Sequence, residues 1–239
     1  MKNQEKDFEN LLLHPIARIH TDFPEKFGIP RQGDVIRLLQ GTIIFERDYR
    51  KEGMLRGLEG FSYLWLIFGF SDSAKEGWKA TVRPPKLGGN DRVGVFASRS
   101  PYRPNPLGLS AVKMEKIVED VNLGPTILVS GVDLVDQTPI YDIKPYLPYA
   151  DCFAEASPGY GKPPEETHLE VEITETLAAL LPEERRELLV RILAQDPRPG
   201  FHHDEREYHF EFASFHISFH VEAERKVVVT EIKRKEKRK

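Results

Sequence analysis

Hydrophobic residues in the first 150 positions fall in short runs interrupted by Pro, Gly, Asn and Asp, a pattern typical of β-strands. The expected strands are residues 16–20, 41–45, 61–68, 93–97, 111–118 and 126–132. No long helical pattern separates them, so we expect an antiparallel sheet. Closure into a barrel would remove its exposed edges. The predicted fold class is therefore mainly β, with a small antiparallel β-barrel.

Long Pro-rich segments connect these strands. They are residues 30–34, 81–91, 98–107 and 137–148. Ordered loops on a rigid β scaffold commonly carry binding and catalytic residues. We therefore expect the functional site in these loops.

The pattern changes after Asp151, where Pro and Gly at 158–164 resemble a linker. The expected elements beyond it are a half-exposed strand at 169–173, a helix that begins at Pro182 and ends before Pro197, and alternating strands from Tyr208 onward. The alternation shifts by one residue at Ala213 and Ser214, which indicates a bulge or a tight turn.

We therefore expect two domains, a barrel over residues 14–151 and a smaller α+β C-terminal domain over residues 165–239. Residues 1–150 carry 20 basic and 19 acidic side chains, whereas residues 151–239 carry 14 and 19, within a total net charge of -4. Residues 83–103 contain five basic residues and one acidic residue, Asp91, and the chain ends in a basic stretch. Both stretches could meet phosphate or carboxylate groups, although the basic end could equally be a solvated terminus.

Several classes of protein and site are not supported. No apolar run approaches the roughly 20 residues that span a bilayer, and the charged first ten residues lack the apolar stretch of a secretory signal. We expect a cytoplasmic protein without membrane contact. Cys152 is the only cysteine, which excludes an internal disulfide.

Common cofactor sites are also missing from the sequence. The chain has neither the Gly-x-Gly-x-x-Gly pattern of dinucleotide sites nor a Gly-Lys-Ser/Thr phosphate loop. Five histidines lie after residue 200, and they are the best metal candidates. Three of them occupy polar positions of alternating strands, so we expect exposed sheet positions and no metal.

Residues 83–90 and 98–108 are the richest in chemistry. Prolines stiffen both stretches, glycines let backbone N–H groups approach a ligand, and arginines offer planar forks for carboxylate or phosphate. The alternative is a proline-braced connection whose arginines pair with nearby acids. Residues 133–146 form a second candidate stretch with three aspartates, which could instead cap turns.

Together these stretches resemble the TsaA-like family, in particular its S-adenosylmethionine-dependent tRNA adenine N6-methyltransferases. The resemblance is carried by residues 30–32, 56–59, 81–90, 94–99, 103–108, 133–146 and 194–199. It implies a β-barrel methyltransferase without a Rossmann fold, which agrees with the missing glycine pattern. It also implies a homodimer that holds the methyl donor near the subunit interface.

The resemblance further implies which residues bind the donor, S-adenosylmethionine. They are Pro30, Arg31, Gln32, Ser71, Asp72, Arg99, Leu109, Ser130, Gly131, Val132 and Asp133. An arginine such as Arg31 or Arg99 can bind the donor's carboxylate through charge-assisted hydrogen bonds of about 1.5–3 kcal/mol each. Because the sulfonium already activates the methyl group, the protein has mainly to align the reactants and exclude water.

In this family the substrate is an anticodon-loop adenosine that carries a threonylcarbamoyl group, and the product is its N6-methyl derivative. The N6 amine is a poor nucleophile, so a carboxylate or amide oxygen that accepts its N–H hydrogen bond would help. Asn105, Asp133 and Asp136 are the catalytic candidates, and the sequence does not rank them.

Contacts with tRNA are expected from basic residues of both domains. Arg83, Lys86, Arg92 and Arg103 would face phosphates or the carboxylate of the threonylcarbamoyl group, and Arg198 with the basic end would make the C-terminal domain a tRNA-contacting arm. Two other functions stay open at this point. One is a non-catalytic RNA-binding barrel, and the other is a methyltransferase that acts on a small metabolite.

Overall fold

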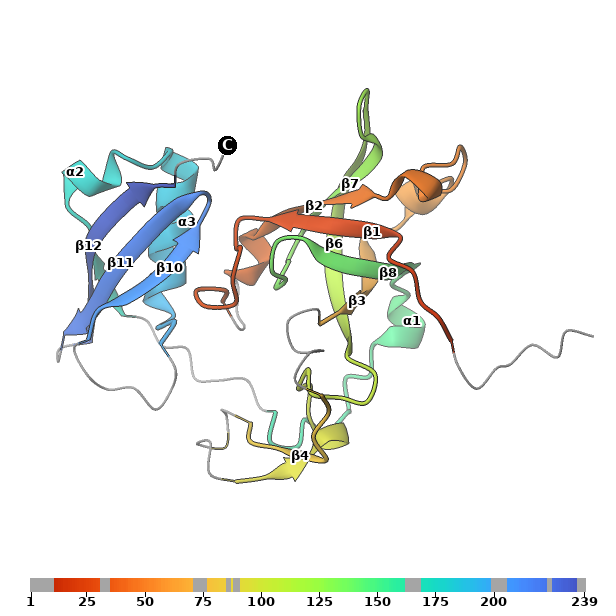
Figure 1. Ribbon diagram of the computed structural model, residues 1–239, viewed down its shortest axis with the longest axis horizontal. Coiled ribbons are helices and arrows are strands. Elements are labelled where there is room, and N and C mark those ends of the chain that lie inside the picture. The colour runs from red at the N-terminus through yellow and green to blue at the C-terminus, as the bar shows by residue number, and fades with distance from the viewer. Residues whose placement is uncertain are drawn as a thin grey trace, which may run out of the picture.

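Six strands close into an antiparallel barrel in the order β1-β2-β7-β6-β3-β8, which confirms the predicted fold class (Figure 1). The computed structural model describes residues 11–30, 35–70, 77–84, 87, 91–161, 169–198, 206–222 and 225–235. The barrel strands are β1 Ala17–Thr21, β2 Gln40–Phe45, β3 Tyr63–Gly69, β6 Leu107–Asp120, β7 Gly124–Ser130 and β8 Thr138–Pro145.

Alternate side chains of these strands fill the barrel. Ile19, Ile43, Leu64, Leu66 and Ile127 are fully buried. Burying a side chain of this kind contributes about 1.5–3 kcal/mol relative to leaving it exposed, so the period-two pattern fixes which face of each strand points inward.

Two expectations for the barrel were wrong in detail. The segment 137–148, expected as a loop, contains strand β8. Its two prolines do not interrupt the strand: Pro139 lies near a register shift opposite Ile67 and Phe68, and Pro145 is the last strand residue. Proline is tolerated at such positions, where the ladder does not need its missing N–H.

The segment 93–97, expected as a barrel strand, lies outside the barrel. Its first part, β5 (Val93–Gly94), pairs with β4 (Thr81–Val82) in a separate two-stranded sheet, and Val95–Ala97 forms a short 3-10 helix. The backbone N–H and the hydroxyl of Ser98 both donate to the Val95 carbonyl, which closes this tight turn.

A four-stranded sheet with the order β10-β11-β12-β9 forms the C-terminal domain, with helix α3 against it (Figure 1). Its strands are β9 Glu170–Glu172, β10 Tyr208–Phe212, β11 Phe215–Glu222 and β12 Lys226–Arg234. The α-helices among the described residues are α1 Pro148–Asp151, α2 Glu175–Ala178 and α3 Glu183–Ala194. Pro182 is the N-cap residue of α3, so the helix begins at Glu183, one residue later than expected.

The sequence shift at Ala213 and Ser214 is a tight turn between β10 and β11. Both residues have positive φ, 50° and 68°. This conformation matches the twist of a two-residue hairpin connection. The predicted bulge or turn at this point is therefore a turn.

The core of the C-terminal domain also contains residues from the N-terminal part of the chain. Phe23, Val35 and Leu39 belong to the same buried cluster as the side chains of α3 and of strands β10, β11 and β12. In Figure 1 the loop after β1, drawn in red, reaches toward this sheet. Of the described helices, none is long and apolar enough to cross a membrane.

Candidate functional site

A cavity of about 1060 Å³ opens at one end of the barrel. Its wall comes from the loop after β1, the end of β3, the loop before β6 and residues 133–138. The volume lies just above the range typical of small-molecule and cofactor pockets, about 300–1,000 Å³. Segments far apart in the sequence therefore meet here.

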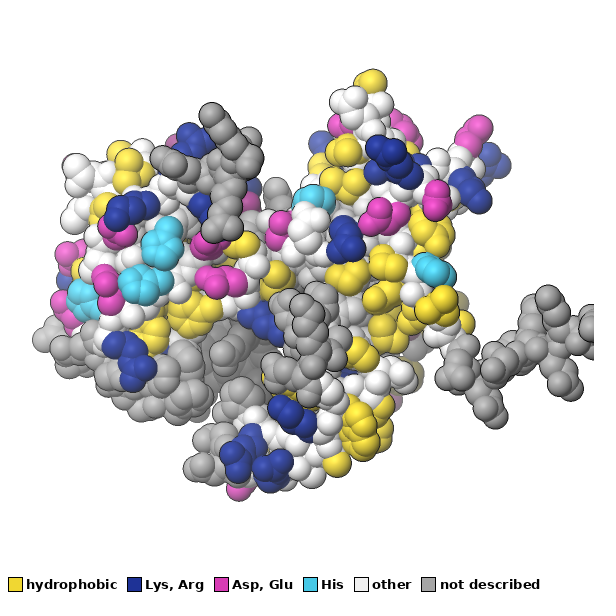
Figure 2. Space-filling view, in the orientation of Figure 1, with side chains coloured by type: hydrophobic (Ala, Val, Ile, Leu, Met, Phe, Trp, Pro, Cys, Tyr) yellow, Lys and Arg dark blue, Asp and Glu magenta, His cyan; other side chains and the backbone are white. Residues whose placement is uncertain are grey.

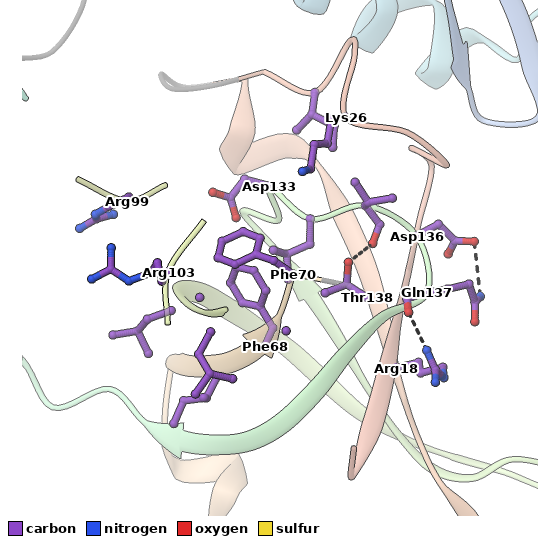
Figure 3. Close-up of a pocket in the computed structure, with 18 of the residues that line it drawn as sticks. Arg18, Lys26, Phe68, Phe70, Arg99, Arg103, Asp133, Asp136, Gln137 and Thr138 are labelled. Atoms are coloured by element: carbon purple, nitrogen blue, oxygen red, sulfur yellow. Dashed lines mark hydrogen bonds between the residues drawn. The ribbon is translucent and has the colours of Figure 1, made fainter. Parts of the chain in front are cut away.

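Two aromatic side chains, Phe68 and Phe70, line this cavity (Figure 3). Phe68 and Phe70 pack edge to face with their ring centroids 5.1 Å apart. A Cβ atom on Gly108 would lie 2.2 Å from the Phe68 ring, so glycine is required for this close approach. The rings and Leu109, which also lines the cavity, provide an apolar surface that can exclude water.

Cationic side chains lie at three places around the cavity, one of them Arg18 beside Gln137. Arg99 and Arg103 stand together on one side of the rings, and Lys26 extends near Asp133 (Figure 3). Arg99 is exposed. Nη1 of Arg103 instead donates to the carbonyls of Val95 (3.0 Å) and Ser98 (2.7 Å), so this side chain braces the loop.

Two of the three catalytic candidates line the cavity. The carboxylate of Asp133 accepts a hydrogen bond from the Ser110 hydroxyl through Oδ1 (2.8 Å), which fixes the group while its side chain stays exposed. Oδ1 of Asp136 accepts the backbone N–H of Thr21 (3.0 Å), so Asp136 holds the end of β1. Asn105 is exposed on its loop, and its carbonyl accepts the Leu107 N–H.

Gln137 has an unusual conformation at the rim of the cavity. Its φ of 63° lies in the left-handed region, which disfavours residues other than glycine. Its carbonyl accepts a hydrogen bond from Arg18 Nη1 (3.0 Å) (Figure 3). Its side-chain amide lies 2.9 Å from Nδ1 of His20. Sequence reasoning missed Gln137, because nothing in its neighbours signals the positive φ.

Among the expected donor residues, Pro30, Arg99, Leu109 and Asp133 line the cavity together. Arg31, Gln32, Ser71 and Asp72 lie outside the described residues, as does Lys86 from the expected tRNA contacts.

Three further donor candidates have other partners in the structure. The backbone N–H groups of Gly131 and Val132 donate to the Leu39 carbonyl, and the Val132 side chain is buried in the barrel core. The Ser130 hydroxyl donates to Glu115. That hydrogen bond, followed by one from Lys113, lowers the pKa of the Glu115 carboxyl. These residues lie directly before Asp133, so they support the cavity wall.

A second groove, of about 1340 Å³, adjoins the first cavity. Ser98 and Arg99 line both, and the expected tRNA contacts Arg83 and Arg92 line the second. Figure 2 shows Lys and Arg side chains gathered over this part of the molecule, around β4. Nε of Arg92 donates to the Thr81 hydroxyl (2.9 Å), which orients its guanidinium.

Arg198, the expected tRNA contact of the C-terminal domain, forms a bidentate ion pair with Asp196 at 2.8 Å for both hydrogen bonds. Its side chain is 11% exposed. Lys233 and Lys235 of the basic end pair with Glu231 and Glu211.

Histidines and carboxylates cover the outer face of the C-terminal sheet (Figure 2). The ring of His209 stacks on that of His216 with centroids 5.5 Å apart, and its Nδ1 lies 2.9 Å from the Ser218 hydroxyl. Within the described part of the chain, no group of three or more His, Cys, Asp or Glu could hold a metal ion. His202 and His203 lie outside that part.

Residues 22–30, between β1 and the expected first donor loop, connect the cavity to the C-terminal domain. Pro24, Lys26 and Pro30 line the cavity. Phe23 packs at 5.4 Å on Phe212 of β10. One stretch of nine residues thus forms part of the cavity wall and part of the C-terminal core.

Polar contacts hold this stretch to both domains. The Phe23 carbonyl accepts the Asp136 N–H (2.7 Å) from the barrel, and the Asp22 carbonyl accepts the Ala213 N–H (2.9 Å) from the C-terminal sheet. The Asp22 carboxylate pairs with Arg185 of α3. Burial raises the pKa of the Asp22 carboxyl, and the Arg185 charge opposes that shift.

Two family models match the chain. The model described as the tRNA-methyltransferase O N-terminal domain matches residues 18–152, which is more than half of the chain, and the TrmO C-terminal domain model matches residues 166–235. The chain belongs to the tRNA-methyltransferase O family. The resemblance to the tRNA-methylating members of the TsaA-like family is thereby confirmed, as is the expectation of an enzyme.

Relatives of known name and structure support this placement. A protein named tRNA (adenine(37)-N6)-methyltransferase from Escherichia coli (strain K12) is 42% identical over 193 residues, covering 78% of this chain and 81% of that protein. A relative from Pseudomonas aeruginosa, 39% identical over 194 residues (78% of this chain, 81% of that protein), is named for S-adenosylmethionine-dependent methyl transfer. The crystal structure of TrmO from Pseudomonas aeruginosa superposes with a TM-score of 0.74 at 31% identity, covering 94% of this chain and 99% of that one.

Proposed function

We propose that this member of the tRNA-methyltransferase O family transfers a methyl group from S-adenosylmethionine to N6 of threonylcarbamoyladenosine in the anticodon loop of tRNA. One observation carries the proposal: the cavity at the barrel mouth places an exposed arginine, Arg99, and an exposed carboxylate, Asp133, around the aromatic pair Phe68 and Phe70, and it opens into a basic groove. The name of the Escherichia coli relative supports the reaction type.

The residues of the cavity fit S-adenosylmethionine. The cavity volume of about 1060 Å³ accommodates a ligand of this size. Arg99 and Lys26 offer positive charge for the donor carboxylate, and Phe68, Phe70 and Leu109 offer apolar contacts for the adenine. When bound, S-adenosylmethionine supplies a methyl group on a positively charged sulfur. Pro30 and Arg99 belong to the proposed donor-binding set, together with Arg31, Gln32, Ser71 and Asp72, whose structure is not described.

Asp133 is the proposed acceptor for the N6 proton. In threonylcarbamoyladenosine the N6 lone pair is delocalised into both the purine ring and the carbamoyl carbonyl, so methylation requires that the N–H proton be removed. Ser110 fixes Oδ1 of Asp133, which leaves Oδ2 to accept the N6–H hydrogen bond and then the proton. Asp136 already binds the Thr21 N–H, and Asn105 lies outside the cavity lining, so both are weaker candidates.

Contacts with tRNA are proposed mainly for the second groove, through Arg83 and Arg92. Arg103 contributes by bracing the loop that separates the two cavities. The C-terminal domain is the second proposed contact. Arg198 and the described lysines of the basic end each pair with a carboxylate there, so we expect a smaller contribution from each of them.

We also propose that the enzyme is a cytoplasmic homodimer with the donor near the interface. Tyr63 and Leu109 on the neighbouring strands β3 and β6 are 46% and 54% exposed, and Leu109 lines the donor cavity. A second copy would cover this apolar face. Tyr63→Glu should then convert a dimer, measured by light scattering, into a monomer, whereas an unchanged mass would contradict this interface.

Titration calorimetry followed by a methylation assay tests the function. The full chain should bind S-adenosylmethionine saturably, and it should methylate tRNA that carries threonylcarbamoyladenosine. Absence of donor binding with intact tRNA binding would instead favour a non-catalytic RNA-binding barrel. Equal methylation of the free nucleoside would favour a small-metabolite enzyme.

A further inference from the structure

The second groove has the chemistry of a site for single-stranded nucleic acid. Four cationic side chains line it, Lys79, Arg83, Arg92 and Arg99, and the described lining contains no carboxylate. The aromatic rings of Phe96, Tyr102 and Tyr160 complete the wall. Cations that follow a phosphate backbone, combined with rings on which bases stack, are typical of single-strand binding.

Phe96 is the most exposed of these rings, at 76%. Its neighbour Val95 in the same 3-10 helix is buried, which anchors the turn and directs the next side chain outward. The Val95 N–H donates to the Ala80 carbonyl (3.0 Å), and the Ser98 hydroxyl donates to the Val95 carbonyl (2.8 Å). The exposed ring therefore sits on a fixed backbone.

Two more side chains reinforce this position. Tyr160 donates from its hydroxyl to the Ala97 carbonyl (2.7 Å), which fastens the segment after α1 to the turn. The guanidinium of Arg103 lies 5.6 Å from the Phe96 ring centroid while it donates to the Val95 and Ser98 carbonyls. These hydrogen bonds hold the backbone around Phe96, and the Arg103 cation lies beside its ring.

The groove is also adjacent to the proposed reaction site. Ser98 and Arg99 line both cavities, so a strand that leaves the donor cavity enters the groove directly. Unpaired loop nucleotides are recognised by splaying their bases onto aromatic side chains. Four cations without a carboxylate match a phosphate backbone better than a loop of another protein.

We infer that this groove holds the unpaired nucleotide next to the target adenosine, with its base stacked on Phe96 and its phosphates near Arg83 and Arg92. The inference rests on the proposed function and adds a second binding site for the same RNA. Arg103 is then a positioning residue for Phe96.

Binding of an anticodon stem-loop RNA, measured by fluorescence anisotropy, tests this site. Phe96→Ala should weaken binding on the order of 5- to 100-fold, the range expected when one base loses its stacking partner. Phe96→Trp should restore it. Tyr149→Ala removes another exposed ring, 85% exposed and outside the groove lining, and should leave RNA binding unchanged. Donor affinity by calorimetry should be the same in all variants, because Phe96 does not line the donor cavity.

Binding of RNAs that lack one base beside the target adenosine identifies the nucleotide that stacks on Phe96. An abasic substitution on one side of the target should weaken binding by the wild type and have no further effect on Phe96→Ala. If the abasic substitutions on both sides of the target each weakened binding by Phe96→Ala as much as binding by the wild type, the inference would be overturned. Unchanged RNA affinity in Phe96→Ala would also overturn it. A change in oligomeric mass with unchanged RNA affinity would show a protein contact and would also overturn it.

These outcomes separate the inference from the proposed function. If the wild type methylates the stem-loop and Phe96→Ala does so with the same KM for RNA, only the inference fails. If the wild type neither binds nor methylates tRNA, both fail.

Discussion

The barrel mouth and the C-terminal sheet share residues 22–30 but use them differently. On the side of the sheet, Phe23 is 2% exposed and belongs to a close-packed core. On the side of the barrel, Lys26 and Pro30 line a cavity that remains open. A close-packed core transmits displacement, so a change in the C-terminal core should shift Lys26 and Pro30 at the cavity wall. With the donor bound in this cavity, as we propose, the C-terminal domain would affect donor binding without contacting the donor.

The largest effect should come from removing the core anchor of this stretch. Phe23→Ala should lower the free energy of unfolding by about 3–5 kcal/mol, because it leaves a cavity beside Phe212. It should also weaken donor binding, since the displaced stretch carries Lys26 and Pro30. Chemical denaturation and calorimetry at a temperature where the variant is folded measure both.

Leu169→Ala is the matched control for this variant. Leu169 is 5% exposed in the same core but lies beside β9, at the opposite edge of the sheet from β10. It should lower stability by about 2–5 kcal/mol and leave donor affinity unchanged. Equal donor affinities in the two variants would contradict the coupling.

Gly28→Ala should have the next largest effect. The new Cβ atom would lie 2.2 Å from the Phe210 ring, at a φ of 93° that alanine rarely adopts. We expect a loss of about 2–4 kcal/mol in stability, with weaker donor binding. Gly57→Ala shares the positive φ, 86°, but has open space around it, so it should cost only about 1 kcal/mol and spare donor affinity.

Arg99→Ala changes the cavity without changing the core. Loss of a charge-assisted contact with the donor carboxylate should weaken donor binding by about 10- to 100-fold, while stability changes by less than about 0.5 kcal/mol. Arg191→Ala, an exposed arginine on α3, is the control and should alter neither quantity. Unchanged donor affinity in Arg99→Ala would remove this residue from the donor site.

The smallest effect is expected at the ion pair between Asp22 and Arg185. Burial raises the pKa of Asp22 above 3.8, so this group's contribution to stability decreases as pH rises through the raised pKa. Arg185→Gln removes the opposing charge and raises that pKa further. The variant should therefore lose about 1–2 kcal/mol at neutral pH, because the pair is partly exposed, and little below pH 4.

Unfolding measured against pH tests this dependence. The double variant Asp22→Asn with Arg185→Gln lacks the titrating carboxyl, and its difference from Asp22→Asn alone should not depend on pH. A loss in Arg185→Gln that is the same at pH 4 and pH 7 would contradict the assignment.

Much of the fold could be predicted from the sequence because burial alternates along strands such as β1, β2 and β10. Five of the six expected barrel strands are strands of the barrel, and the segment after Tyr208 forms β10 and β11. Strand β8 was missed because its prolines read as a loop, although they occupy positions the ladder tolerates. The segment 93–97 was misassigned because a side-chain hydrogen bond from Ser98 closes a turn that hydrophobicity alone does not reveal.

The candidate site was predictable only in part. Motif residues Pro30, Arg99, Leu109 and Asp133 do line one cavity. The roles of Arg103 and of residues 22–30 could not be read from the sequence. Arg103 contacts backbone carbonyls, and residues 22–30 pack against a core built mostly from the C-terminal part of the chain. Local patterns carry no information about such distant partners.

The most direct measurement is the transfer of label from methyl-deuterated S-adenosylmethionine to bulk bacterial tRNA, with nucleosides identified by mass spectrometry. We expect label in N6-methyl-threonylcarbamoyladenosine. No labelled nucleoside, with donor binding intact and unmethylated threonylcarbamoyladenosine present, would contradict the proposed function.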